Sequence, residues 1–370
     1  MSPTSGPTIL VIDDDAGPGN ALRTTVGKDA AEVIVRTPDD LEEADLRDAD
    51  LVLVDYELKG WNEEGELTSA PNGLALSAVI REQMNEMERP GAGGVALYSG
   101  QVSEIAANLP AEVRGFTVAR LNNLEWVFEK DDDEAHQGVA SLARAVSELP
   151  ENWPGDADGA NLELHKVLDL RPKAEYFETA REDIDACHPP IHELSGATHA
   201  LAVIRWLAQR ILPYPAFLTD RFGLAARLRI GVDELDRVLA GKSALMRGLE
   251  EVRYTGALEK LFGMHWWRSG LDGLIFDWTD GGQKPLETKV QSLAGRRKLN
   301  FVDADLVPVI DSTYRPTDIV AVDTAVRLRP DDWPVFADQA WGSIEVVSSS
   351  PQLRGLVLPA DLSSLASSDG

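Results

Sequence analysis

The chain has 370 residues, a net charge of -27 and one cysteine, Cys187. This length suits at least two domains, and the lone cysteine excludes an intramolecular disulfide framework. The excess of 62 acidic over 35 basic residues repels phosphate backbones and disfavours nucleic acid as a partner. The sequence has no apolar run of roughly 18 residues and no signal-peptide pattern, so we expect a cytoplasmic protein without membrane contact.

The first 150 residues alternate short apolar runs with segments of helical apolar spacing. Apolar runs typical of buried strands occupy residues 8–13, 32–36, 51–55, 94–98 and 125–129. Helical spacing occurs in residues 19–28, 39–48, 72–86, 103–108 and 135–149. Such alternation predicts a parallel sheet with helices on both faces. We expect residues 1–150 to form an α/β domain, a flavodoxin-like, doubly wound sheet of five parallel strands.

The rest of the chain has a different organisation. Residues 151–160 are rich in Pro, Gly and Asp and are typical of a linker. Residues 161–262 predict a helical subdomain, with helices over 162–186 and 193–212. Residues 263–370 predict an α+β output region with four short strands, at residues 274–278, 319–322, 343–347 and 355–358.

Charged and hydroxyl side chains follow the expected strands of the first domain. Because parallel strands present their carboxyl ends at one edge of a sheet, these side chains should meet there. Clustered carboxylates repel one another without a cation, and oxygen ligands suit Mg²⁺. An aspartate facing Mg²⁺ can attack a phosphoryl group. The residues concerned are Asp13, Asp14 and Asp15 after the first strand, Asp55 after the third, Ser99 after the fourth and Lys130 after the fifth.

Four motifs carry these residues: VIDDD at 11–15, LVLVDYEL at 51–58, ALYSG at 96–100 and EK at 129–130. In this order they resemble the receiver domain of two-component response regulators, over about residues 7–149. The resemblance implies the following roles: Asp55 as phosphoacceptor, Ser99 as switch hydroxyl, Lys130 as the phosphate-pairing lysine, and Asp13, Asp14, Asp55 and the backbone carbonyl of Glu57 as ligands of Mg²⁺.

Three features depart from the family pattern. Residues 59–71 form an insertion beside the acceptor, which could act as a lid, and the segment from Ser99 to Lys130 is longer than usual. Val127 stands where the family has an aromatic switch residue, and no proline follows Lys130. These departures leave open a pseudo-receiver adaptor that acts without phosphorylation.

A group of possible metal ligands lies in the second half, within thirteen positions. Cys187, His188, His192, Glu193 and His199 could hold zinc. Pro189 and Pro190 interrupt the segment, so packed or solvent-exposed histidines are the favoured interpretation.

Residues 221–241 have the apolar spacing of a helix-turn-helix. The second helix carries Asp233, Glu234 and Asp236, which are poor partners for DNA. A plain helical hairpin is therefore the favoured interpretation, with a DNA-binding transcription regulator as the alternative function. Arg296, Arg297 and Lys298 form the one tight basic cluster of the sequence, expected in a solvated loop.

Together these patterns predict a response-regulator-like signalling protein. Its partners would be a histidine kinase or another phosphodonor and an output protein, and a homodimer is one option for its assembly. It would accept a phosphoryl group and act through protein contacts rather than as an enzyme, although an enzymatic output region is left open.

Overall fold

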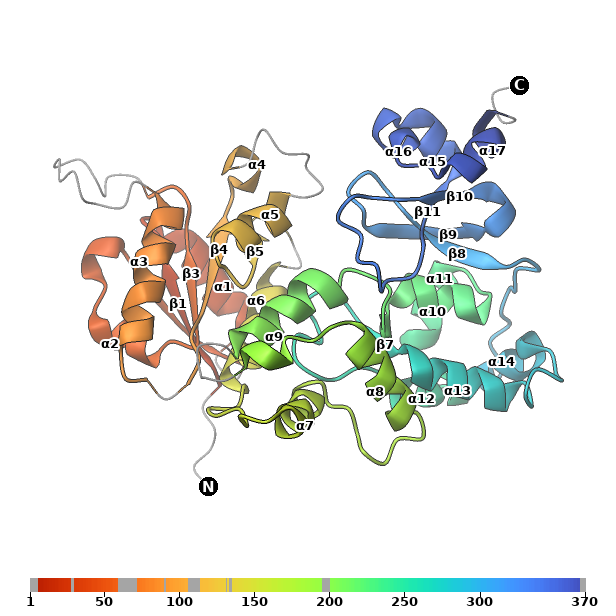
Figure 1. The fold of residues 1–370 in the computed structure, drawn as a ribbon, viewed down its shortest axis with the longest axis horizontal. Helices are drawn as coiled ribbons and strands as arrows, with labels where there is room; N and C mark the ends of the chain where they lie inside the picture. The colour runs from red at the N-terminus through yellow and green to blue at the C-terminus, as the bar shows by residue number, and fades with distance from the viewer. Residues whose placement is uncertain are drawn as a thin grey trace. The chain divides into compact units, whose positions relative to one another are not determined.

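The computed structural model describes residues 6–27, 30–58, 72–89, 91–105, 114–130, 132, 135–194 and 200–366 (Figure 1). The chain divides into two compact units, each assembled from separate stretches. The first contains Met1–Asp169, Pro189–Gln209 and Gly256–Phe262, and the second contains Leu170–His188, Arg210–Thr255 and Gly263–Gly370. The segment 151–160, expected as a linker, thus lies inside the first unit, and the expected subdomain 161–262 is shared between the units.

The first unit contains the expected five-stranded parallel sheet. Its strands are β1 (Thr8–Ile12), β2 (Glu32–Arg36), β3 (Leu51–Val54), β4 (Gly94–Ser99) and β5 (Val127–Glu129). The order is β2-β1-β3-β4-β5, and every neighbouring pair is parallel. The order reverses between β1 and β3, and in flavodoxin-like sheets ligands bind outside the carboxyl ends of the strands at such a point.

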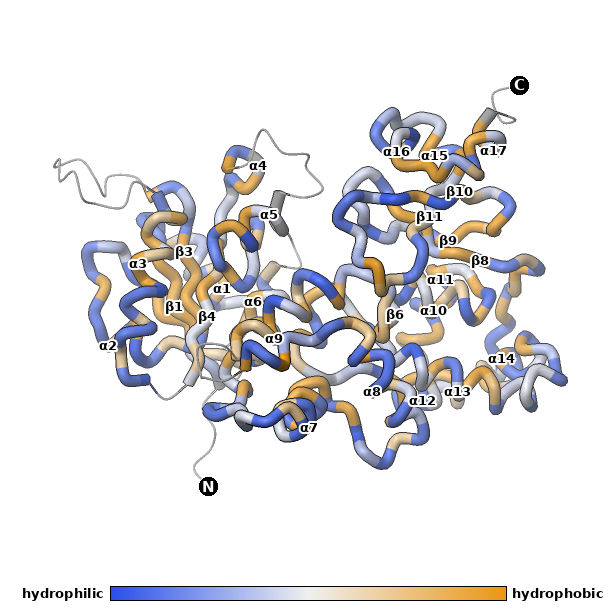
Figure 2. Tube along the Cα trace, in the orientation of Figure 1, coloured by the Kyte–Doolittle hydropathy of each residue, from blue (hydrophilic) through white to orange (hydrophobic). Residues whose placement is uncertain are grey.

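Helices cover both faces of this sheet (Figure 1). They are α1 (Ala16–Val26), α2 (Glu43–Asp48), α3 (Gly73–Glu86), α4 (Val102–Ile105), α5 (Arg114–Leu121) and α6 (Ala135–Ser147). One core cluster joins alternate strand residues, such as Leu10 and Val52, to Leu76 and Ile80 of α3 and Val118 of α5. Apolar segments are concentrated along β1 and β3 in Figure 2. The α/β class is confirmed, whereas α5 was not expected. α4 coincides with the described part of the expected helix 103–108, whose residues 106–108 lie outside the described residues.

Two further helices complete the first unit, α7 (Ala157–Val167) and α9 (Leu201–Trp206), the latter continued by a π-helical turn at Leu207–Ile211. The expected single helix 162–186 is interrupted, because Asp169 takes a left-handed conformation with φ 48° and Pro172 follows. Glu125, just before β5, is fully buried, and its ion pairs attach α9 to this unit. Its carboxylate pairs with Arg81 at 2.8 Å and with Arg205 of α9 at 2.7 Å.

The second unit begins with a helical core. Its helices are α8 (Phe177–Ala186), α10 (Arg221–Leu228), α11 (Val232–Leu239), α12 (Ala244–Glu251), α13 (Arg268–Trp278) and α14 (Leu286–Ala294). The short strands β6 (Leu218–Thr219) and β7 (Trp266–Trp267) pair antiparallel beside it. The prediction of a strand at 274–278 was wrong, because this apolar run is the last part of α13. A short apolar run fits a buried helix as well as a strand.

Two antiparallel strand pairs follow, β8 (Leu306–Ile310) with β9 (Pro316–Ala321), and β10 (Ala325–Leu328) with β11 (Ala340–Ser343). The chain then forms α15 (Ile344–Ser349), α16 (Pro351–Gly355) and α17 (Leu362–Ala366). Most of the expected strand 343–347 is α15, because the Ser343 side chain accepts from the amide of Val346 and caps a helix there. In place of the expected strand 355–358 there is a single bridge from Val357 to Leu328. The expected strand 319–322 largely coincides with β9.

Single 3₁₀ turns occur at Pro38–Asp40, Ile191–Glu193, Val322–Thr324 and Pro359–Asp361. Within the described ranges, none of the helices combines the length and apolar character that crossing a bilayer requires.

Candidate metal centre at the sheet edge

The turn after β1 places its acidic residues in different environments. Asp13 is 1% exposed, whereas Asp14 and Asp15 are exposed. The amide of Asp15 donates to Oδ1 of Asp13 at 2.9 Å, and the Asp15 carboxylate in turn accepts from the amide of Gly17 at 2.8 Å. Asp15 is therefore occupied as the N-cap of α1, while Asp13 and Asp14 remain at the sheet edge.

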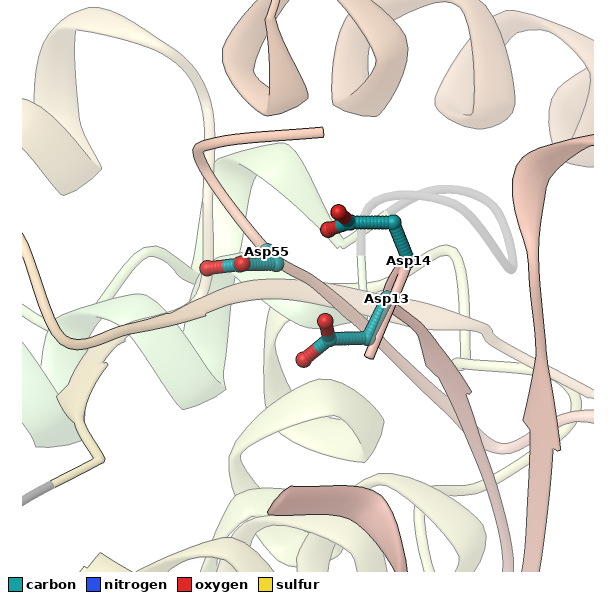
Figure 3. Close-up of side chains that lie close together, drawn as sticks. All are labelled: Asp13, Asp14 and Asp55. Atoms are coloured by element: carbon teal, nitrogen blue, oxygen red, sulfur yellow. The ribbon is translucent and has the colours of Figure 1, made fainter. Parts of the chain in front are cut away.

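Asp55 reaches the same edge from β3. Its amide continues the ladder by donating to the carbonyl of Ile12 at 3.0 Å. Its Oδ1 accepts from the amide of Tyr56 at 2.8 Å. Ligand oxygens of Asp13, Asp14 and Asp55 all lie within 4.8 Å of one another, and Figure 3 shows the three carboxylates gathered there. The expected cluster of Asp13, Asp14 and Asp55 is thus brought together by the fold.

Lys130 connects two of these carboxylates. Its Nζ lies 2.7 Å from Oδ2 of Asp13 and 3.0 Å from Oδ2 of Asp55. Burial raises the pKa of Asp13, and hydrogen bonds from Lys130 and the Asp15 amide offset part of that rise. Burial also opposes the charge on Lys130, but the hydrogen bond and charge of Asp13, with the charge of Asp55, outweigh it and raise the pKa of Lys130. The ammonium therefore stays charged between the carboxylates.

Ser99 and Glu57 lie at the same edge of the sheet, joined by a residue that the motifs do not point to. Ser99 is 1% exposed, and its Oγ accepts from the amide of Gln101 at 3.2 Å. The Gln101 side chain donates to the carboxylate of Glu57. The backbone carbonyl of Ser99 accepts from the amide of Lys130 at 3.2 Å, so Ser99 is tied to the strand end that carries the lysine. Gln101 carried no signal in the sequence, because its role depends on two strand ends meeting.

Gly73, the first residue of α3, packs against the backbone of Asp55. A Cβ at this position would lie 1.8 Å from the carbonyl oxygen of Asp55, so only glycine fits. The amide of Gly73 donates to the carbonyl of Tyr56 at 2.8 Å, and Asn72 caps the helix by accepting from the amide of Ala75 at 3.1 Å. The start of α3 thus holds the acceptor segment in place. The insertion at 59–71, expected as a lid, lies outside the described residues.

Tyr98 lies beside Lys130 and contacts His136. The hydroxyl of Tyr98 and Nε2 of His136 are 3.0 Å apart, and Nζ of Lys130 lies 5.8 Å from the centre of the Tyr98 ring. This distance is within the range of a cation–π contact. The motif ALYSG contains Tyr98, but its contact with His136 required the packing of α6 on the sheet.

The zinc site considered as an alternative for the second half is not seen among the described residues, where the acidic cluster is the one group with metal-ligand geometry. Cys187 and His188 belong to the second unit and His192 to the first, and His199 lies outside the described residues. Cys187 is buried, and burial raises the pKa of its thiol to about 11, which disfavours the thiolate that zinc binds.

The donor set of the acidic cluster suits Mg²⁺. Carboxylate oxygens are its preferred protein ligands, and the ion usually retains several waters. Asp14 is exposed, so water can reach an ion at this edge. No family model matches the sequence, and a search of curated proteins found no match. The chemistry of this site must therefore be inferred from its geometry.

Proposed function

We propose that the first unit is a phosphoryl-accepting regulatory domain of the response-regulator type, with Asp55 as the acceptor. The observation that carries the proposal is the placement of Lys130 between Asp13 and Asp55, beside a third carboxylate. One mostly buried cation and a group of oxygens that could bind a metal, around a single aspartate, fit the transfer of a highly charged group.

In the proposed reaction, a carboxylate oxygen of Asp55 attacks the phosphorus of a phosphodonor, and the bond to the leaving group breaks with its electron pair. Lys130 would pair with an oxygen of the transferred phosphoryl group, and the hydroxyl of Ser99 would donate to another. Asp13, Asp14, Asp55 and the backbone carbonyl of Glu57 would hold Mg²⁺, which when bound offsets charge on the phosphoryl oxygens. The donor would be a histidine kinase or a small acyl phosphate, in the cytoplasm.

Phosphorylation would add negative charge at a sheet edge that already holds three carboxylates. We propose that Lys130 then exchanges its contact with Asp13 for one with the phosphoryl group, since both compete for the same ammonium. Such a change at the ends of β4 and β5 would alter contacts with an output protein. The alternative within the same fold is a pseudo-receiver adaptor, which never turns over a phosphate.

DNA binding is the second candidate function, because α10 and α11 are consecutive helices joined by a short turn in which Arg229 is left-handed, with φ 56°. However, the exposed face of α11 presents Asp233 and Asp236 with Arg237, and two acids there oppose phosphate contacts. We therefore favour protein contacts as the output.

The test uses the full chain with Mg²⁺ and acetyl phosphate, followed by intact-mass spectrometry. We expect the mass of one phosphoryl group on the wild type and on Asp48→Asn, an exposed acid of α2 outside the cluster. We expect none on Asp55→Asn. A folded wild type that stays unmodified with several donors would establish the pseudo-receiver alternative.

A further inference from the structure

The second unit contains a cavity of about 300 Å³ where α11 ends, α12 begins and α14 ends. Its apolar side is formed by the buried residues Val238 and Ala294. Its polar side is formed by Lys242, Ser243, Arg296 and Arg297. Three cationic side chains therefore surround one concave site, and the lining contains no carboxylate.

This local charge contrasts with that of the whole chain, whose net charge is -27. Arginines at the end of α10 and just after it are paired with acids: Arg227 with Asp272, and Arg229 with Glu287 and Asp305. Across the described ranges, in contrast, the three cations of the cavity form no ion pair with a carboxylate. Cations gathered around a hollow without a counter-charge attract an anion to it.

The loop that carries Arg296 and Arg297 is fixed in place. The side chain of Gln291 in α14 donates to the carbonyl of Arg297 at 2.8 Å and accepts from the amide of Leu299 at 3.0 Å. Leu299 is 4% exposed and anchors the loop in the helical core. A site whose backbone is already ordered loses less conformational entropy when it binds a ligand.

Arg297 and Ser243 also keep hydrogen-bond donors that an anion in the cavity could use. Arg297 donates one N–H to the carbonyl of Arg237 at the end of α11, but a guanidinium carries five such donors. Ser243 caps α12, accepting from the amide of Met246 at 3.1 Å, and its own hydroxyl can still donate. The positive end of the α12 dipole adds to the field of the three cations.

We propose that this cavity binds the phosphate group of a small phosphorylated molecule. Two guanidinium groups and an ammonium match a dianion better than a single carboxylate, because the planar fork of arginine pairs with two phosphate oxygens at once. The volume lies at the lower end of the range of small-molecule sites. The site lies in the second unit and does not depend on phosphorylation of Asp55.

Calorimetric titration of the full chain with inorganic phosphate at low salt tests this proposal. A chelator removes divalent ions, so that the acidic cluster contributes nothing. We expect binding of one phosphate per chain, weakened at least about tenfold in Lys242→Ala and in Arg296→Ala, since each loses a charge-assisted contact. Lys298→Ala is the matched control: it removes a charge from the same basic run but lies outside the cavity lining, and should bind like the wild type.

Three results would overturn the proposal: no phosphate binding by the folded wild type, unchanged binding in both cavity variants, or an equal loss in Lys298→Ala, which would mean a diffuse surface field. A further arm separates the sources of phosphate. Glycerol phosphate should compete with inorganic phosphate for the cavity, whereas duplex DNA should not. Competition by duplex DNA alone would indicate a nucleic-acid surface instead.

Discussion

Nζ of Lys130 lies 2.7 Å from Oδ2 of Asp13, although the two residues are 117 positions apart in the sequence. The contact is mostly buried, with the Lys130 side chain 15% exposed and Asp13 1% exposed. In a low-dielectric edge that also holds Asp55, the ammonium offsets the repulsion between carboxylates. The contact therefore affects both the stability of the first unit and its affinity for a cation.

Replacing Lys130 with Met should lower the free energy of unfolding by about 1–3 kcal/mol in the absence of metal, because a mostly buried carboxylate loses its partner. Thermal unfolding with and without Mg²⁺ checks this. Mg²⁺ should raise the melting temperature of Lys130→Met more than that of the wild type, since the ion replaces the missing charge. Lys166→Met, which removes an exposed lysine paired with Glu163, should cost little. Equal losses in the two variants would contradict the prediction.

The acidic cluster should bind Mg²⁺ at millimolar or weaker affinity, because two or three carboxylates with water ligands hold this strongly hydrated ion only modestly. Asp14→Asn should weaken binding by about tenfold or more. Replacing a residue that only contacts a metal ligand can already have an effect of this size. Titration calorimetry measures the difference. In Asp15→Ser, which keeps an N-cap and removes a charge outside the cluster, affinity should change far less. Similar losses in both variants would indicate bulk electrostatics.

Gly73→Ala should destabilise the first unit by about 1–3 kcal/mol or more, since the added Cβ overlaps the carbonyl of Asp55. It should also slow phosphorylation of Asp55, because the acceptor segment must move. Gly115→Ala in α5 is the control: its Cβ would meet nothing within 4 Å, and alanine favours a helix by up to about 1 kcal/mol. Chemical denaturation of the two variants compares them directly, and a neutral Gly73→Ala would refute the packing assignment.

Asp361 should contribute stability that depends on pH. Its carboxylate accepts from the backbone and the guanidinium of Arg327, and the side-chain hydrogen bond from Arg327 is the main cause of its lowered pKa. A lowered pKa stabilises the fold above the unfolded value of about 3.9. This stabilisation is lost as the pH falls through the lower, folded value. The Asp361 carboxylate links the 3₁₀ turn at Pro359–Asp361 to Arg327 of β10.

Asp361→Asn should therefore lower the melting temperature by about 2–4 °C at neutral pH. The difference from the wild type should shrink below about pH 4, where the wild-type carboxyl also protonates. Thermal scans from pH 7 to 3 follow this convergence. Asp323→Asn, an exposed acid in the neighbouring turn, should match the wild type throughout. A constant difference at all pH values would contradict the ion-pair explanation.

The full chain should not bind duplex DNA at physiological salt. The net charge of -27 and the acids on the exposed face of α11 oppose the electrostatic attraction that supplies most nonspecific affinity. A gel shift at low and moderate salt tests this. Micromolar binding that weakens steeply with salt and disappears in Arg237→Ala would instead support the transcription-regulator alternative.

Local patterns in the sequence were sufficient for the parallel sheet and for most of its helices. Each strand is a short apolar run bounded by turn-forming residues, so its position and its buried character are encoded locally. Because parallel strands end at one edge, the residues after them could also be placed together in advance. The convergence of Asp13, Asp14, Asp55 and Lys130 follows from that rule.

Contacts between distant segments were decided only by the tertiary structure. Residues 274–278 could have been a strand or a helix until their packing in α13 was known. Arg205 lies 80 positions from Glu125, and nothing local marks the pair that fixes α9 to the first unit. Likewise, Lys242 joins Arg296 at one cavity only because α11, α12 and α14 share a core. Periodicity encodes which face of an element is buried, whereas its partner depends on how the elements pack in three dimensions.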